Sequence, residues 1–313
     1  MIVIFDTNAY RNLVMKKELC EVQAEVQKIN ALEQAKGILS CMSSTVGMEL
    51  ISHLLDDQNT PSFKSCLKAC QAIYLHCGDN QNFRTLPLPE VQIAKEYFNI
   101  EDQQGIDTQN EIGGILYQIS QSPTNTTIQK NRTNINLIKQ FIRGAEQNYA
   151  DQVLTFMKSI DPNAPDWSFL QNDESMRAKY LNKIRSDEFD RETAAAMLAA
   201  TEMLLKDRNY NLPNLSSEQR RDQIDLYINS YKTALVYRKR CWECFIQDGY
   251  DLTQKSRANA LWDEKLLHYV GHQVNGHDII LVTSDKMMKR AADEICPNNC
   301  VMSYIDYMNY IQP

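Results

Sequence analysis

Two acidic residues near opposite ends of the chain directly follow runs of apolar residues. Asp6 follows Ile2–Phe5, and Asp285 follows Ile279–Val282 after two polar residues. An apolar run of this length without alternation is typical of a strand that is buried on both faces of a parallel sheet. In open α/β sheets, ligands bind outside the carboxyl ends of the strands. We therefore predict one site that is built from both ends of the chain.

Two further acids lie on helices that we predict beside these strands. Glu49 lies in the first turns of a helix that follows a second predicted strand, Ile38–Met42, and ends near Leu55. Asp263 lies on a helix predicted over Arg257–Tyr269, and the neighbouring Glu264 is the alternative at this place. Both helices adjoin the predicted sheet, so their acids are candidates for the same site.

Four carboxylates that converge on one site need a positive charge between them. Carboxylates a few ångströms apart repel one another and resist ionising together. A divalent cation removes this conflict, and ligand sets made only of oxygen suit Mg²⁺ or Mn²⁺. Such an ion lowers the pKa of a bound water, which can then attack a phosphodiester. Asn8, Thr283 and Ser284 are polar neighbours that could orient the acids or the phosphate.

In this order, the residues resemble the PIN-domain nucleases. The resemblance lies in the segments Asp6–Asn8, Val46–Leu50 around Glu49, Asp263, and Thr283–Asp285. It implies that Asp6, Glu49, Asp263 and Asp285 bind one or two metal ions and hydrolyse RNA to products with 5′-phosphate and 3′-hydroxyl ends. Many members of the family are toxins of bacterial toxin–antitoxin pairs, so the resemblance also implies an inhibitory protein partner.

The predicted elements divide the chain into a split α/β domain and a helical insertion. Residues 1–60 and 250–313 supply the strands, whereas no convincing strand is predicted over 61–249. The expected fold is therefore a three-layer α/β/α PIN-like domain with a parallel sheet, split by a large all-helical insertion. Helices are predicted over Ala9–Lys36, Ser62–His76, Pro89–Phe98, Gln109–Ile119, Ile128–Ile160, Glu174–Lys206, Ser217–Gln247 and Lys286–Ile295, and a last strand over Cys300–Tyr304.

Charge and composition limit the classes of function. The 33 basic and 40 acidic residues give a formal charge of −7, which excludes a globally basic nucleic-acid binder but allows a local basic patch. Arg238, Lys239 and Arg240 are the basic cluster that we predict to contact nucleic acid, although a solvated helix face explains them equally well. Further positive points are Arg220 and Arg221, and four residues on another predicted helix: Lys130, Arg132, Lys139 and Arg143.

No feature of the sequence predicts a membrane protein or a secreted one. No apolar run approaches the roughly 20 residues that span a bilayer, and the first predicted strand leaves no room for a charged leader, so we expect a cytoplasmic protein. The nine Cys indicate reduced thiols. Two pairs of possible metal ligands, Cys241 with Cys244 and His268 with His272, offer a zinc site as a weak alternative. The gap between the Cys pair and the His pair is longer than in a typical zinc finger.

The function that these observations favour is a metal-dependent endoribonuclease with an RNA substrate. Two alternatives remain open at this point. The first is a structure-specific DNA nuclease that uses the same acids, and the second is a non-catalytic PIN-like binding or scaffold protein in which the acids are vestigial. The sequence also leaves open whether the chain forms a homo-oligomer.

Overall fold

Strand β1 (Ile2–Phe5) lies inside a four-stranded parallel sheet with the order β2-β1-β5-β6. The computed structural model describes residues 1–312 apart from 79–82, 161, 164–169, 171, 250–258, 275 and 297–298, and apart from the side chain of residue 160. Strand β5 (Ile279–Val282) pairs with β1 in parallel, with Phe5 opposite Val282. The prediction of a parallel sheet built from both ends of the chain is therefore confirmed, and the carboxyl ends of these two strands lie level.

The other strands are only two residues long. Strands β2 (Leu39–Ser40) and β6 (Val301–Met302) form the two edges of the sheet. Strands β3 (Met42–Ser43) and β4 (Thr85–Leu86) form a separate parallel pair. The expected strand over Ile38–Met42 is therefore two short strands. The expectation of no strand over 61–249 is wrong at β4, because two residues are too few to show a period of two.

The helices beside the sheet lie where they were predicted, with two exceptions, of which the first is that no helix was predicted over Tyr304–Ile311. The helices are α1 (Thr7–Val14), α2 (Leu19–Ala35), α3 (Ser44–Ser52) with the 3₁₀ turn η1 (His53–Leu55), α14 (Asn259–Leu267), α15 (Lys286–Ile295) and α16 (Tyr304–Ile311). The predicted single helix over Ala9–Lys36 is wrong, since the chain leaves helical geometry at Met15 and Lys16 has a positive φ of 62°. A capping box between Glu18 and Glu21 then starts α2.

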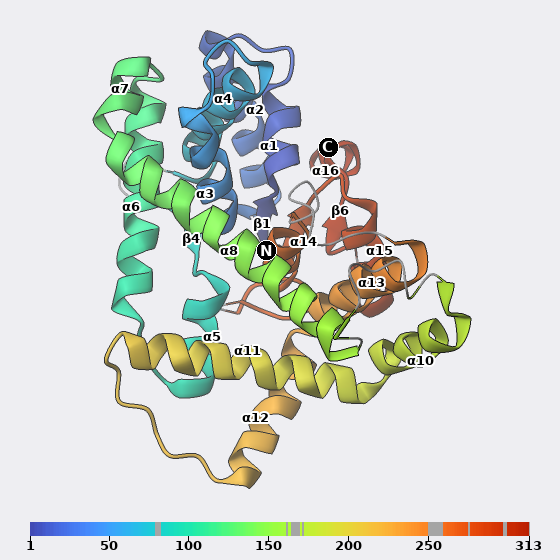
Figure 1. Cartoon of the computed structure of the whole chain (residues 1–313). Coiled ribbons are helices and arrows are strands. Elements are labelled where there is room, and N and C mark those ends of the chain that lie inside the picture. The colour runs from blue at the N-terminus through green and yellow to red at the C-terminus, as the bar shows by residue number, and fades with distance from the viewer. Residues whose placement is uncertain are drawn as a thin grey trace.

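The described part of 61–249 consists mainly of helices, as predicted, with loops between them and the strand β4. The helices are α4 (Pro61–Cys77), α5 (Pro89–Phe98), α6 (Gln103–Gln121), α7 (Asn125–Lys130), α8 (Arg132–Ile160), α10 (Glu174–Arg185), α11 (Asp187–Asp207), α12 (Ser217–Ser230) and α13 (Lys232–Asp248). Three predicted long helices are each divided in two, at Asn131, Ser186 and Tyr231. Figure 1 shows α8 running diagonally across one face of the molecule, from the side of α6 and α7 toward α10.

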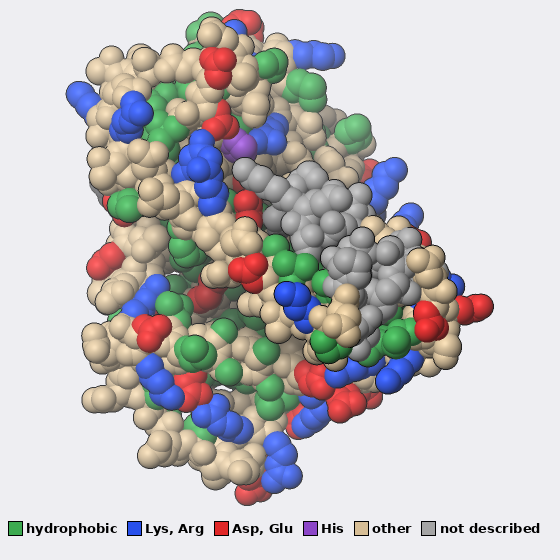
Figure 2. All heavy atoms as spheres, in the orientation of Figure 1, with side chains coloured by type: hydrophobic (Ala, Val, Ile, Leu, Met, Phe, Trp, Pro, Cys, Tyr) green, Lys and Arg blue, Asp and Glu red, His purple; other side chains and the backbone are tan. Residues whose placement is uncertain are grey.

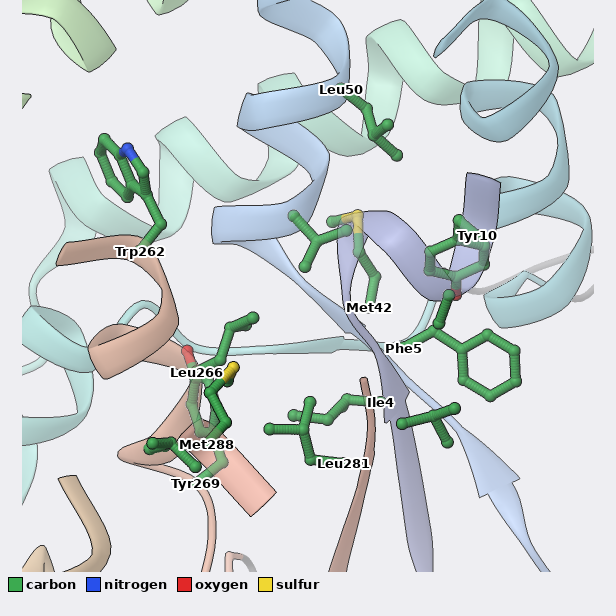
Figure 3. Close-up of a cluster of buried hydrophobic side chains, with 14 of the residues drawn as sticks. Ile4, Phe5, Tyr10, Met42, Leu50, Trp262, Leu266, Tyr269, Leu281 and Met288 are labelled. Carbon is green, nitrogen blue, oxygen red and sulfur yellow. The ribbon is translucent and has the colours of Figure 1, made fainter. Parts of the chain in front are cut away.

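One large hydrophobic core joins the sheet to the helical segment. Buried side chains of this core include Val3 in β1, Ile73 in α4, Leu116 in α6 and Phe245 in α13. Figure 3 shows part of it, in which residues from distant parts of the chain lie close together: Ile4, Met42, Leu50, Leu266, Leu281 and Met288. A smaller core lies between α5, α11, α12 and α13. The molecule is a mostly helical α/β protein whose helical segment packs directly against the elements of its small parallel sheet.

Among the described helices, none is both long enough and apolar enough to cross a membrane.

Candidate functional site

The four predicted acids line one cavity at the carboxyl ends of β1 and β5. Asp6, Glu49, Asp263 and Asp285 surround a volume of about 240 Å³, together with the predicted supporting residue Asn8. Asp6 lies between β1 and α1, Asn8 in α1, Glu49 in α3, Asp263 in α14 and Asp285 just before α15. Segments more than 200 residues apart in sequence therefore form the site. The cavity has room for an ion with several waters.

Asp6 is the most buried of the four acids, with 4% of its surface exposed. It caps α1, and its Oδ1 accepts a hydrogen bond from the Ala9 amide. Its Oδ2 accepts one from the Thr283 hydroxyl at 2.6 Å. Burial raises the pKa of Asp6 to about 6, and the negative charges of Glu49 and Asp285 add to this rise, while the two hydrogen bonds oppose it.

Asp285 and Glu49 are each held through one carboxylate oxygen. Asp285 caps α15, where its Oδ1 accepts hydrogen bonds from the amides of Met287 at 2.7 Å and Met288 at 2.8 Å. Glu49 accepts one from the Thr7 hydroxyl through Oε2 at 2.5 Å. Within the described part of the chain, the second oxygen of each has no hydrogen-bond partner. These oxygens are therefore free to bind an ion.

Asp263 belongs to this site, whereas its neighbour Glu264 does not. The hydroxyl of Tyr237 donates to Asp263 Oδ2 at 3.1 Å. Burial, followed by the charge of Asp285, raises the pKa of Asp263 well above its usual range. Glu264 instead forms a buried ion pair with Arg238, with an N–O distance of 2.8 Å, and does not line the cavity. Of the two acids that the sequence left open, the structure brings only Asp263 to the other three.

The supporting residues are placed differently from one another. Thr283 is buried and links the two strand-end acids, since its hydroxyl donates to Asp6 and accepts from the amide of Asp285 at 3.0 Å. Ser284 is exposed, accepts a hydrogen bond from Asn12 Nδ2, and is not part of the cavity wall.

Three residues at the site were not identified from the sequence. Thr7 and Tyr237 hold acids in place, and Arg11 lines the cavity. Arg11 donates to the Cys66 sulfur at 3.2 Å, and its buried Nε has no hydrogen-bond partner among the described residues. Arg11 lies one helical turn after Asn8, so the helical period could have found it. Tyr237 had no such signal, because it is one of many aromatic residues on a long helix.

The predicted nucleic-acid cluster on α13 is engaged within the chain. Its ion pairs are Arg238 with Glu264, Lys239 with Asp190, and Arg240 with Glu294. Each charge is therefore compensated by a carboxylate of this protein, and Arg238 is largely buried. The residues of the weak zinc alternative also have other partners, since Cys241 contacts the sulfur of Met287 and His268 is hydrogen bonded to Tyr227.

The donor set fits a divalent cation in chemistry and charge. All the donors are oxygens, and the charged neighbours that shift the pKa values of Asp6 and Asp263 are all carboxylates. In the described ranges, no group of three or more His, Cys, Asp or Glu side chains is already arranged around a metal position. Binding an ion at this cavity therefore requires the carboxylates to move closer together, which their mutual repulsion opposes until the ion arrives.

The raised pKa of Asp6 predicts how pH acts on the metal-free protein. A carboxyl group whose pKa rises on folding contributes most to stability when the pH is below its pKa in the unfolded chain, which is 3.8 for Asp6. This contribution is lost as the pH rises through the pKa in the folded protein, which is about 6. We expect the unfolding free energy of the wild type, relative to Asp6→Asn, to fall by roughly 3 kcal/mol over this range. Urea titrations in EDTA at several pH values measure this difference in unfolding free energy. A difference that does not change with pH would show that folding does not raise the pKa of Asp6.

No protein-family model, no curated protein and no solved structure matches this chain.

Proposed function

We propose that this protein is a nuclease that depends on a divalent metal ion and hydrolyses RNA phosphodiesters at the cavity lined by Asp6, Glu49, Asp263 and Asp285. The observation that carries the proposal is the convergence of these four carboxylates on one cavity, at the carboxyl ends of two parallel strands. Burial and the neighbouring carboxylates raise the pKa values of Asp6 and Asp263, and a bound cation makes the ionised forms of these two acids favourable.

The proposal includes a PIN-like three-layer domain. The parallel order β2-β1-β5-β6 supports it, as do the helices that connect and flank these strands. In this interpretation, residues 61–249 are an insertion that packs against the sheet domain through a shared core. Residue Tyr237 would then be a contribution of the insertion to the site.

In this proposal, the residues of the chain position the carboxylates that bind the ion and the phosphate that is cleaved. Bound Mg²⁺ or Mn²⁺ supplies Lewis acidity and a water of lowered pKa. The Ala9 amide and the Thr283 hydroxyl hold the two oxygens of Asp6. The first turn of α15 holds only Oδ1 of Asp285, which leaves Oδ2 for the ion. Because the Tyr237 hydroxyl occupies Oδ2 of Asp263, Oδ1 is the atom of this acid that can bind the ion or accept a proton. Arg11 on the cavity wall is placed to donate to a phosphate oxygen.

A cleavage assay tests the proposal directly. We expect the purified protein to cut a labelled single-stranded RNA with Mn²⁺ or Mg²⁺ and to leave it intact with EDTA, and we expect Asp285→Asn to be inactive under all conditions. A DNA strand of the same sequence, measured in parallel, separates an RNA nuclease from a DNA nuclease. Absence of metal-dependent cleavage on both substrates, or equal cleavage by the variant, would refute the proposal.

A further inference from the structure

We propose that a cavity between α6, α8 and α11 binds a small organic ammonium ion with an apolar body. The cavity has a volume of about 600 Å³, within the range of roughly 300–1,000 Å³ that small-molecule sites occupy. Among the described residues, none lines both this cavity and the acidic one. The proposal therefore concerns a second site and does not depend on the proposed function.

Three helices frame this cavity. Figure 1 shows α6, α8 and α11 bordering the region of α5. Helix α8 packs against α3 and α7, whereas α11 packs against α5, α10 and α12, and residues of both helices line the space between them. A groove that takes a helical peptide is open at both ends. A space bordered by three helices instead suits a compact molecule.

Most of the cavity wall is apolar. Its buried part includes Leu88, Val91 and Ile138. Leu137 and Phe141, one turn apart on α8, also line the cavity and expose 57% and 52% of their surface. Figure 2 shows hydrophobic side chains around a hollow on this face, between α8 and α11. These side chains favour a ligand with an apolar body, because its binding removes their surface from water.

The charged groups of the wall leave one negative charge without a partner. Glu90 forms an ion pair with Lys265, and Asp102 forms one with Arg208. Glu111 is exposed on α6 and forms no ion pair with any described residue. Arg208 is the only cation among the described residues of the wall, and Asp102 already compensates it. An anionic ligand would meet an excess of carboxylates, whereas an ammonium ion would balance this excess.

Asp102 supplies the specific contact. Only 1% of its surface is exposed, and its Oδ2 accepts a hydrogen bond from Arg208. Its Oδ1 is also buried and has no hydrogen-bond partner among the described residues. Leaving a buried carboxylate oxygen in this state is costly. Because Asp102 belongs to the cavity wall, an N–H group of a bound ammonium ion can supply the missing hydrogen bond.

Arg208 does not prevent this contact. It bonds Oδ2 of Asp102, so Oδ1 remains for the ligand. One carboxylate can hold two cations, as Glu202 does with Lys206 and Arg220. The ammonium group therefore lies at Asp102, the N-cap residue of α6.

Glu111 is too far away to hold the same ammonium group. It comes nine residues after Asp102, which corresponds to roughly 14 Å along a helix. This separation exceeds the distance over which charges in salt solution interact strongly. Glu111 therefore provides a matched acid of the same wall that should hardly affect the affinity.

Titration of the whole protein with naphthylethylamine, followed by the NMR signals of this probe, tests the site. Naphthylethanol and naphthylacetate present the same apolar body with a neutral and an anionic head group. We expect the amine to bind about tenfold or more tightly than the acetate, with the alcohol between them. Asp102→Asn should weaken binding of the amine about tenfold, whereas Glu111→Gln should change it less than about twofold.

A second pair of variants locates the binding without changing a charge. Ala200 is an exposed residue of α11 in the cavity wall, and Ala200→Trp should fill the cavity and weaken binding of the amine at least about tenfold. The matched control is Ala199→Trp, since Ala199 is an exposed neighbour on the same helix that does not line the cavity. It should bind the amine as the wild type does. Circular dichroism checks that every variant is folded.

The outcomes decide the proposal whether or not the protein cleaves RNA. Equal affinity for the three probes, or no binding of the amine up to about 5 mM, would overturn it. Binding that Ala200→Trp leaves unchanged would also overturn it, because the amine would then lie elsewhere. A dimer in solution that Ala200→Trp dissociates, without any binding of the amine, would instead assign the cavity to a second copy of the chain.

Discussion

Replacing Asp6 by Asn is expected to reduce kcat/KM for metal-dependent RNA cleavage by more than about 100-fold. Removing a residue that only hydrogen-bonds a metal ligand costs up to about 100-fold, so the loss of a ligand itself should cost more. The substitution removes the most buried charge of the cavity, yet it keeps an oxygen that can accept from the Ala9 amide. Asn and Asp are similar as N-caps, so α1 should remain intact. Initial cleavage rates with Mn²⁺ measure the loss, and calorimetric titration with Mn²⁺ measures whether the ion still binds.

The matched control is Asp57→Asn, an exposed acid outside the cavity. It should cleave RNA and bind Mn²⁺ as the wild type does. If the wild type shows no Mn²⁺ binding that Asp6→Asn removes, the acids are vestigial and the scaffold alternative gains support. If Asp6→Asn and Asp57→Asn cleave RNA equally well, the activity does not arise at this cavity.

Replacing Arg238 by Met is expected to lower the free energy of unfolding by about 3–5 kcal/mol. Arg238 Nε lies 3.0 and 2.9 Å from the two carboxylate oxygens of Glu264, and this ion pair joins α13 to α14. Without Arg238, the Glu264 carboxylate is left buried and unpaired, which is costly because the interior does not solvate it. Urea unfolding at pH 7, followed by circular dichroism, measures the loss.

The double variant Arg238→Met/Glu264→Leu is the control for this buried ion pair. Replacing both partners with apolar residues removes the unpaired charge, so the double variant should recover most of the stability that the single variant loses. A double variant that is no more stable than Arg238→Met would mean that packing of the Arg238 side chain, rather than its charge, accounts for the loss. Because α14 carries Asp263, the single variant should also disturb the acidic cavity.

Local sequence was sufficient to predict the two four-residue strands, β1 and β5, and most helices. The bounds of β1, β5, α5 and α15 agree with their predicted ranges, since each has a clear apolar run or clear start and stop residues. The predictions were wrong where one or two residues interrupt a long helical pattern, as at Lys16 and Ser186. They also missed the two-residue strand β4 and the helix α16. In these places, backbone turns and side-chain caps decide the boundary, and they hardly alter the hydrophobic period.

The sequence by itself determined that acids follow buried strands at both ends of the chain, because apolar runs that end in Asp are visible without coordinates. Only the tertiary structure decided which acid of the Asp263–Glu264 pair lines the cavity, since adjacent residues on a helix point in different directions. It also decided that Arg238 is paired internally and that Tyr237 lies at the site. These facts depend on contacts between distant segments, which the packing of α1, α13 and α14 around the sheet creates and no local pattern encodes.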